Sequence, residues 1–237
     1  MMINTALAQT LIQTQFPQWA SLPISPVAHS GWDNRTFHLG DEMLIRLPSA
    51  EDYAPQVRKE QTWLPYLATS LPLPIPTPIA MGQPSSLFPY PWSIYRWLSG
   101  EIATRARIQN LNQFAVTLAD FLVALHAIDA KEGPVAGPHN FYRGGSLAVY
   151  DAEVHDSITQ LDGLIDTDKA KALWQTALAS HWPSTPVWVH GDISAGNLLV
   201  ENGQLKAVIR PMPGYVPRIA PLFQMRSQIN FSVSFGV

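Results

Sequence analysis

Residues 187–209 limit the possible folds of this chain more than any other part of it. They read VWVHGDISAGNLLVENGQLKAVI. The apolar run Val187–Val189 has the composition of a β-strand. Asn202-Gly203 is the dipeptide best suited to place two successive residues at positive φ, as a type I′ hairpin requires. The stretch therefore predicts a strand, a polar loop and then a hairpin whose two apolar strands would hold that loop rigid.

The polar loop carries three residues in a spacing that has a known chemical use. His190, Asp192 and Asn197 are arranged as H-x-D-x-x-x-x-N, the spacing of a kinase catalytic loop. There the Asp accepts the proton of the attacking hydroxyl and the Asn holds Mg²⁺. The alternative is an ordinary β-turn in which Asp192 caps a backbone N–H and His190 packs. The strand before the loop and the hairpin after it favour the catalytic loop.

These motifs identify a family resemblance. HGD-x-x-x-x-N followed by LLV, a turn and AVI resembles the aminoglycoside phosphotransferase-like family of small-molecule kinases, which share the protein-kinase-like fold. The resemblance runs from about Gly31 to Ile209. It implies an α+β, two-lobed fold with a small antiparallel-sheet N-lobe and an incomplete helical C-lobe. The expected division is an N-terminal nucleotide-binding lobe at 1–98, a C-terminal lobe with the catalytic loop at 99–209 and a divergent tail at 210–237.

The hydrophobic pattern before the hinge agrees with such an N-lobe. Apolar residues at near-helical spacing predict a helix over residues 2–16, ended by Pro17. Strands are expected at 22–30, 36–39, 42–47 and 91–98, and a helix at 50–68. The segment LPLPIPTP lacks alternate N–H groups, so we expect an extended surface connector. A PxxP-type ligand for another protein is its alternative.

Three residues of this lobe are candidates for nucleotide binding by resemblance. The turn around Gly31 would cover the ATP phosphates, although it lacks the G-x-G-x-x-G pattern and a plain hairpin turn is the alternative. Arg46 falls where kinases carry the strand lysine that touches the α/β-phosphates, and Glu60 would hold it in place. The alternatives are a surface arginine and a solvated glutamate.

The hinge between the lobes is expected at Ser99-Gly100-Glu101, where backbone groups would meet the adenine. Tyr95 and Trp97, just before it, are expected to pack the sheet rather than stack on a base. The strongest helical stripe follows, over residues 108–125. His126 near its end is interpreted as structural, because no second metal ligand lies at i ± 4. Helices are also expected at 152–161 and 167–180, with their apolar stripes in the core.

Composition excludes several classes of protein. The net charge of −3 argues against a nucleic-acid binder. The absence of cysteine excludes disulfides and fits a reducing cytosol. We expect no secretory signal and no membrane span, because the first positive residue is Arg35 and no uncharged apolar stretch approaches about 20 residues. The expected protein is cytoplasmic and does not bind membranes, and its oligomeric state is left open.

The resemblance stops at Ile209. In the family the strand AVI is followed by the Asp that binds Mg²⁺, whereas here Arg210 follows. The remaining residues contain no Asp or Glu and four prolines. Our hypothesis is that Arg210–Val237 is a frame-shifted or foreign end. The rival hypothesis is a genuine, shortened variant.

The resemblance implies a phosphotransferase that moves the γ-phosphate of ATP, or alternatively GTP, to a hydroxyl of a small molecule of the aminoglycoside type. Asp192 would be the base, His190 would brace the loop, and Asn197 would hold Mg²⁺. Loss of the second metal ligand predicts weak or absent activity. The alternative is a non-catalytic remnant that at most binds nucleotide. A metallophosphatase is discounted, because no D-x-H lies upstream and Leu198 rather than His follows Asn197.

Overall fold

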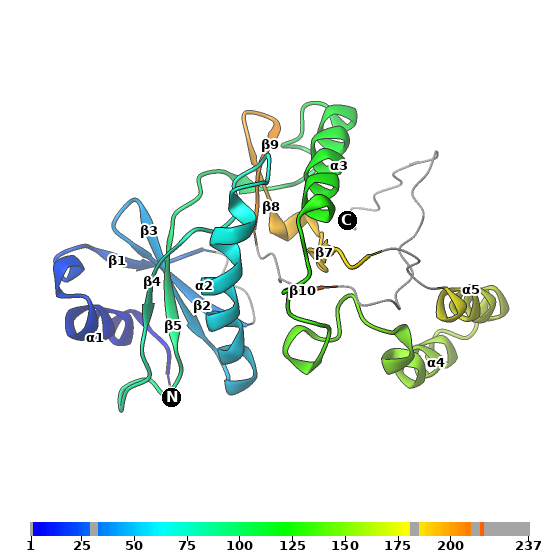
Figure 1. Cartoon of the computed structure of the whole chain (residues 1–237), viewed down its shortest axis with the longest axis horizontal. Helices are drawn as coiled ribbons and strands as arrows, with labels where there is room; N and C mark the ends of the chain where they lie inside the picture. The colour runs from blue at the N-terminus through cyan, green and yellow to red at the C-terminus, as the bar shows by residue number, and fades with distance from the viewer. Residues whose placement is uncertain (1, 29–32, 181–184, 210–213, 216–237) are drawn as a thin grey trace. The chain divides into compact units, whose positions relative to one another are not determined.

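The computed structural model describes residues 2–28, 33–180, 185–209 and 214–215. The fold is α+β, with a small antiparallel sheet and helices, as predicted from the sequence (Figure 1). By its internal contacts the chain divides into two units. The first comprises residues 1–128 and 190–213, and the second comprises residues 129–189 and 214–237.

The first unit is built on a five-stranded antiparallel sheet with the order β1-β2-β3-β5-β4. Its strands are β1 (Ile24–Pro26), β2 (Asn34–Leu39), β3 (Met43–Pro48), β4 (Pro78–Gly82) and β5 (Trp92–Arg96). Strands β2, β3 and β5 confirm the prediction. The strand expected at 22–30 is shorter in the structure. The expected surface connector ends at strand β4, which was not predicted because of the prolines before it. Proline is tolerated in β4 because it begins an edge strand.

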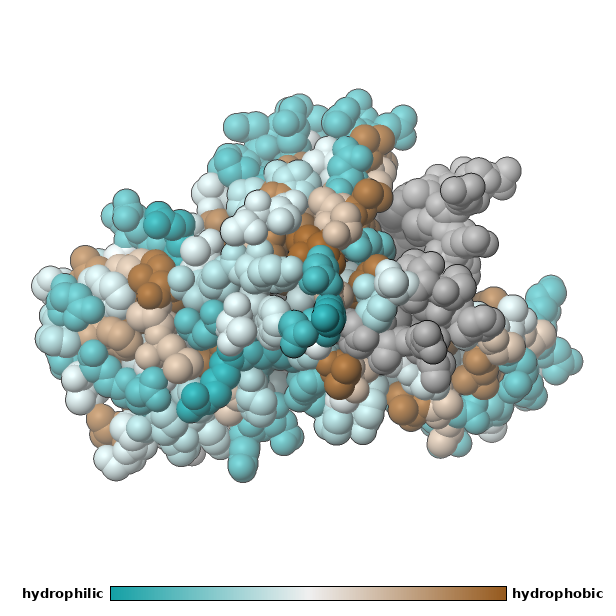
Figure 2. All heavy atoms as spheres, viewed as in Figure 1, coloured by the Kyte–Doolittle hydropathy of each residue, from teal (hydrophilic) through white to brown (hydrophobic). Residues whose placement is uncertain are grey.

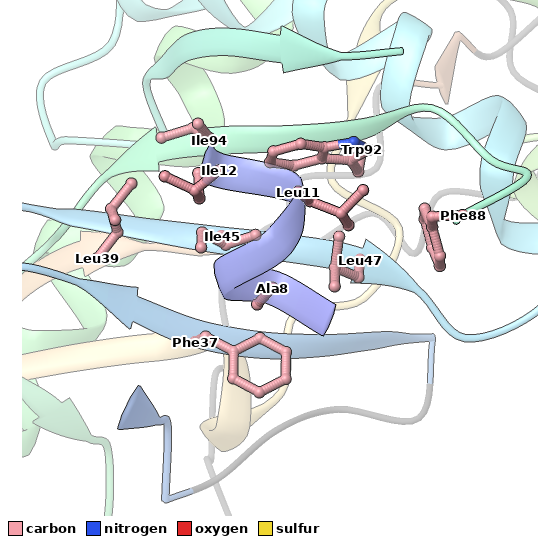
Figure 3. Close-up of a cluster of buried hydrophobic side chains, with 10 residues drawn as sticks. All are labelled: Ala8, Leu11, Ile12, Phe37, Leu39, Ile45, Leu47, Phe88, Trp92 and Ile94. Carbon is pink, nitrogen blue, oxygen red and sulfur yellow. The ribbon is translucent and has the colours of Figure 1, made fainter. Parts of the chain in front are cut away.

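One face of this sheet is covered by helix α1 (Thr5–Gln15). The helix begins where Asn4 Oδ1 accepts a hydrogen bond from the Leu7 N–H at 3.0 Å, an N-cap. Its buried residues pack on every second residue of the central strands, as the period of a strand requires (Figure 3). This core consists of Ala8, Leu11, Ile12, Phe37, Leu39, Ile45, Leu47, Phe88, Trp92 and Ile94.

Helix α2 (Ala54–Ala68) follows a 3₁₀ turn at Glu51–Tyr53 and packs against β4 and β5. The side-chain amide of Gln61 ties the helix to both strands, because its Nε2 donates to Ala80 O and to Ser93 Oγ, each at 3.1 Å. Val57, Glu60, Leu64 and Leu67 are buried on the inner face of the helix. The helix predicted at 50–68 is thus confirmed, and it carries one buried carboxylate.

The first unit also contains the catalytic-loop hairpin and the longest helix described. Strands β8 (Leu198–Glu201) and β9 (Gln204–Val208) form the predicted hairpin, and β6 (Glu101–Ile102) joins β8 directly after the expected hinge. Asn202 and Gly203 have φ values of 51° and 78°, the consecutive positive values that a type I′ turn needs. Helix α3 (Leu111–Ala127) contacts β9 and buries Leu118, Phe121 and Leu125, which confirms the helical stripe.

The second unit contains α4 (Asp151–Gln160), α5 (Thr167–Ala179) and the strand pair β7 (Trp188–Val189) with β10 (Gly214–Tyr215). Both helices were predicted, but the prediction that their apolar stripes lie in the core was wrong in part. Ile158 is buried, whereas Leu161 and Leu173 are exposed. Hydrophobic surface is visible over both helices in Figure 2. Periodicity identifies the apolar face of a helix but not whether another element covers it.

In the part of the chain that the structure describes, no helix is long and apolar enough to span a membrane.

Candidate active site

The sheet face opposite α1 is lined by polar and aromatic side chains that border a cavity. Because side chains alternate along a strand, the residues between the core positions point to this face. A cavity of about 670 Å³ lies there. Its lining from β2, β3 and β5 comprises Asn34, Thr36, His38, Leu44, Arg46, Tyr95 and Arg96, and Trp97 follows directly after β5.

The cavity also reaches the hinge and the catalytic-loop hairpin. Leu98, Gly100 and Ile102 line it from the hinge, and Gly196, Leu199 and Ile209 line it from the loop and hairpin. Apolar side chains thus come from both sides, with Leu44 on β3 and Leu199 on β8. A slot with apolar walls and a few polar groups has the character of a small-molecule site. A flat, partly apolar group with a charged extension would match this lining.

One charged residue of the cavity lining, Arg46 on β3, forms an ion pair with Glu60 on α2. Arg46 Nη1 lies 2.9 Å from Glu60 Oε2, and the two side chains are only 15% and 5% exposed. The alternatives of a surface arginine and a solvated glutamate are therefore wrong. Burial lowers the pKa of Arg46, but the nearby Glu60 carboxylate and other groups outweigh it, so the pKa is raised overall. Arg46 stays a cation beside the cavity.

Tyr95 joins this ion pair, which the sequence did not reveal. Its hydroxyl donates to the same Glu60 oxygen, and the Arg46 guanidinium lies 5.2 Å above its ring. Tyr95 is fully buried, and burial raises the pKa of its phenol above the usual value, with the Glu60 charge adding to the rise. Tyr95 thus packs the sheet as expected but also lines the cavity.

The predicted catalytic loop is held by hydrogen bonds among its three predicted residues and the end of β9. Asn197 Nδ2 donates to the Asp192 backbone O at 2.9 Å and to Asp192 Oδ2 at 3.0 Å. The Ile209 N–H donates to Asn197 O at 2.8 Å. The loop therefore presents a carboxylate that one neighbouring amide orients.

His190 connects the loop to the end of β9 through hydrogen bonds of its imidazole. It is buried, and its Nδ1 accepts from the Asp192 N–H at 3.2 Å. The proton must then sit on Nε2, which lies 3.2 Å from Ile209 O and donates to it. The imidazole thus links the loop to the end of β9.

Two residues near the hinge were not singled out as site residues by the sequence. The ring of His38 packs against that of Trp97 with the centroids 4.3 Å apart and the planes tilted by 52°, and both residues line the cavity. The alternation of β2 was the available signal, since Phe37 and Leu39 face the core and His38 must face away. Trp97 was expected to pack the sheet, and its ring does contact His38 of strand β2, where both residues also line the cavity.

Some predicted positions remain untested by the geometry. Gly31 and Arg210 lie outside the described residues. His126 carries a pKa lowered by burial. In the described ranges, no group of three or more His, Cys, Asp or Glu residues is arranged to hold a metal. That His126 is structural stays a prediction.

Comparison with known proteins identifies the fold and the family. A profile of the phosphotransferase enzyme family matches residues 24–209, most of the chain. The chain belongs to this phosphotransferase family. The match ends at Ile209, where the sequence resemblance was predicted to stop. No curated protein matches the chain.

Solved structures of phosphotransferases share the fold. The GDP complex of aminoglycoside 2'-phosphotransferase-IIIa has a TM-score of 0.72 and 22% identity over 90% of this chain and 74% of that one. The streptomycin–ATP–APH(2")-IIa ternary complex gives 0.55 and 19% over 89% and 70%. The macrolide 2'-phosphotransferase MphH from Brachybacterium faecium gives 0.58 and 19% over 88% and 73%.

Proposed function

We propose that this chain binds a nucleoside triphosphate in the cavity of its first unit and descends from an enzyme that transfers the γ-phosphate to a hydroxyl of a small molecule. The observation that carries the proposal is one cavity that contacts both parts of the predicted site. Arg46 of the buried Arg46–Glu60 ion pair lines the cavity, and the loop that holds the Asp192 carboxylate reaches it through Gly196. Phosphoryl transfer needs positioned charge rather than covalent chemistry.

Each residue has a proposed role. Arg46, supported by Glu60, meets the α/β-phosphates, and the turn at Gly31 covers them. Asp192 has one carboxylate oxygen bound to Asn197, and its other oxygen accepts the proton of the acceptor hydroxyl. His190 keeps the loop in register with β9. We propose an aminoglycoside or a macrolide as the acceptor. One structural relative is solved with streptomycin, and another is a macrolide 2'-phosphotransferase.

The proposed metal is Mg²⁺. Asn197 uses its Nδ2 on Asp192, which leaves Oδ1 as a ligand. Asn197 Oδ1 would thus supply one oxygen ligand to a magnesium ion, and the ion would neutralise charge on the phosphates. The second metal ligand that the family resemblance implies, an Asp, is missing from the sequence, because Arg210 follows Ile209. If its loss costs about 3–4 kcal/mol in the transition state, the rate falls by roughly 10²–10³.

The nucleotide is proposed to be ATP, with GTP as the alternative, since relatives are solved with GDP and with ATP. We place the activity in the cytosol, which suits a sequence without cysteine. A second candidate function is a non-catalytic nucleotide binder. The missing carboxylate favours it.

The test is nucleotide binding and turnover by the full chain with each nucleotide and panels of aminoglycosides and macrolides. Wild type should be stabilised thermally by ATP or GTP yet show little phosphorylated product. Arg210→Asp should restore turnover, and Arg210→Asp/Asp192→Asn should remove it again. Binding without product in the Arg210→Asp variant favours the non-catalytic function. Absence of nucleotide binding would refute both functions.

A further inference from the structure

Three side chains from three elements meet at one carboxylate oxygen. Arg46 from β3 and Tyr95 from β5 both bind Oε2 of Glu60 from α2. Tyr95 also lies under the Arg46 guanidinium, 5.2 Å from it. It therefore touches both members of the ion pair, Glu60 through its hydroxyl and Arg46 through its ring face.

This arrangement leaves part of the guanidinium available. A guanidinium is a planar fork with five N–H donors. Nη1 is used by Glu60, and within the described ranges Arg46 makes no other hydrogen bond. Because the side chain lines the cavity, its remaining donors are available to an anionic ligand there. A cation–π contact resists tilting of the guanidinium plane over the ring.

The hydroxyl of Tyr95 is more than a packing group. Phenylalanine would fill the same buried volume without a polar atom that needs a partner. The phenol instead supplies a second donor to Glu60, whose position then no longer depends on Arg46 alone. An arginine side chain loses much rotamer freedom when it is fixed by a ligand. Fixing it before the ligand arrives removes that cost from binding.

We propose that Tyr95 is a positioning residue for phosphate binding, which holds the Arg46–Glu60 pair so that the free edge of the guanidinium meets the phosphates of the nucleotide. This role rests on the proposed function, because it requires a nucleotide in the cavity. It predicts a specific signature. Loss of the hydroxyl should weaken binding of phosphates and leave binding of the nucleoside unchanged.

The experiment compares the dissociation constants of ATP, AMP and adenosine for the full chain. In Tyr95→Phe, the ratio of ATP affinity to adenosine affinity should fall roughly tenfold, the scale of one hydrogen bond to a charged group. Adenosine affinity should stay the same. The matched control is Tyr90→Phe, which removes a phenol hydroxyl from the side chain that packs against the α1 core, and it should keep the wild-type ratio.

A double-mutant cycle separates positioning from general loosening. In an Arg46→Met background, Tyr95→Phe should not change the ratio further, because no guanidinium is left to position. If Tyr95→Phe does not fold, Glu60→Gln takes its place and should give the same loss. A wild-type ratio in the folded variant, or an equal effect of Tyr95→Phe with and without Arg46, would overturn the role. A wild type that binds neither ATP nor GTP would overturn the proposed function as well. Failure of the Tyr95 role alone would leave nucleotide binding by the wild type intact, so the two results can be distinguished.

Discussion

Replacement of Arg46 by methionine should destabilise the chain far more than loss of a surface charge. Both members of the pair are nearly buried, at 15% and 5% side-chain exposure. Removing one partner of a buried pair leaves the other charge without compensation, at a cost of about 3–5 kcal/mol. The Tyr95 hydroxyl still donates to Glu60 in the variant. We therefore expect the lower end, about 3 kcal/mol.

The double variant Arg46→Met/Glu60→Gln tests the cause. It removes both charges, and the amide oxygen of the new side chain can still accept from Tyr95. Its cost should be about 1 kcal/mol, because a neutral pair of similar size carries no stranded charge. The double variant should thus be more stable than the single one, although it carries one more substitution.

Urea unfolding followed by tryptophan fluorescence and circular dichroism measures these differences. With a slope of about 2 kcal/mol per molar urea, the midpoint should fall by about 1.5 M in Arg46→Met and about 0.5 M in the double variant. Arg107→Met is the matched control, because its ion pair with Glu101 is 41% and 69% exposed. Its cost should stay under about 1 kcal/mol. Equal midpoints for the single and double variants would refute the reasoning.

Two further predictions concern packing and pH. A Cβ at Gly82 would lie 1.9 Å from the buried ring of Trp92, so Gly82→Ala should lower the free energy of unfolding by about 2 kcal/mol. Gly196→Ala meets open space and should be near neutral in the same urea assay. Burial lowers the pKa of His126, so the unfolded chain, with a pKa of about 6.5, binds the proton more readily. Stability should therefore fall as the pH drops below about 6.5, and His126→Gln should flatten the decline in Tm between pH 7.5 and 5.5; an unchanged slope would contradict this.

The parts of the fold that the sequence predicted are those where a periodic pattern and a local turn agree. Strand β3 alternates between Ile45 toward the core and Arg46 toward the cavity, and the Asn202 turn fixes the register of the hairpin. Strand β4 was missed because its proline-rich approach suggests no strand, although an edge position tolerates Pro78. The stripe of α5 was predicted as core, yet Leu173 is exposed, since a pattern on one helix says nothing of its partner.

The site shows the same limit. The pairing of Arg46 with Glu60 could be predicted because a strand and the following helix are neighbours in this family. The hydroxyl of Tyr95 could not, because tyrosine on an apolar strand also reads as a packing residue. Only the meeting of three elements at one oxygen shows that its polar atom is used. The contact between the rings of His38 and Trp97 is likewise a tertiary contact.

The contacts that brace the predicted catalytic loop do not depend on the side chain of the residue that follows Ile209. His190 donates to the Ile209 carbonyl, and the Ile209 N–H donates to Asn197 O. Both contacts use backbone atoms of Ile209 and neither requires the side chain of the next residue. In the proposed function, Arg210 stands in the sequence where the acidic metal ligand would be, and these hydrogen bonds do not depend on it. We therefore expect nucleotide binding to persist while transfer chemistry is weakened, because different residues would supply the loop geometry and the charge that holds the metal.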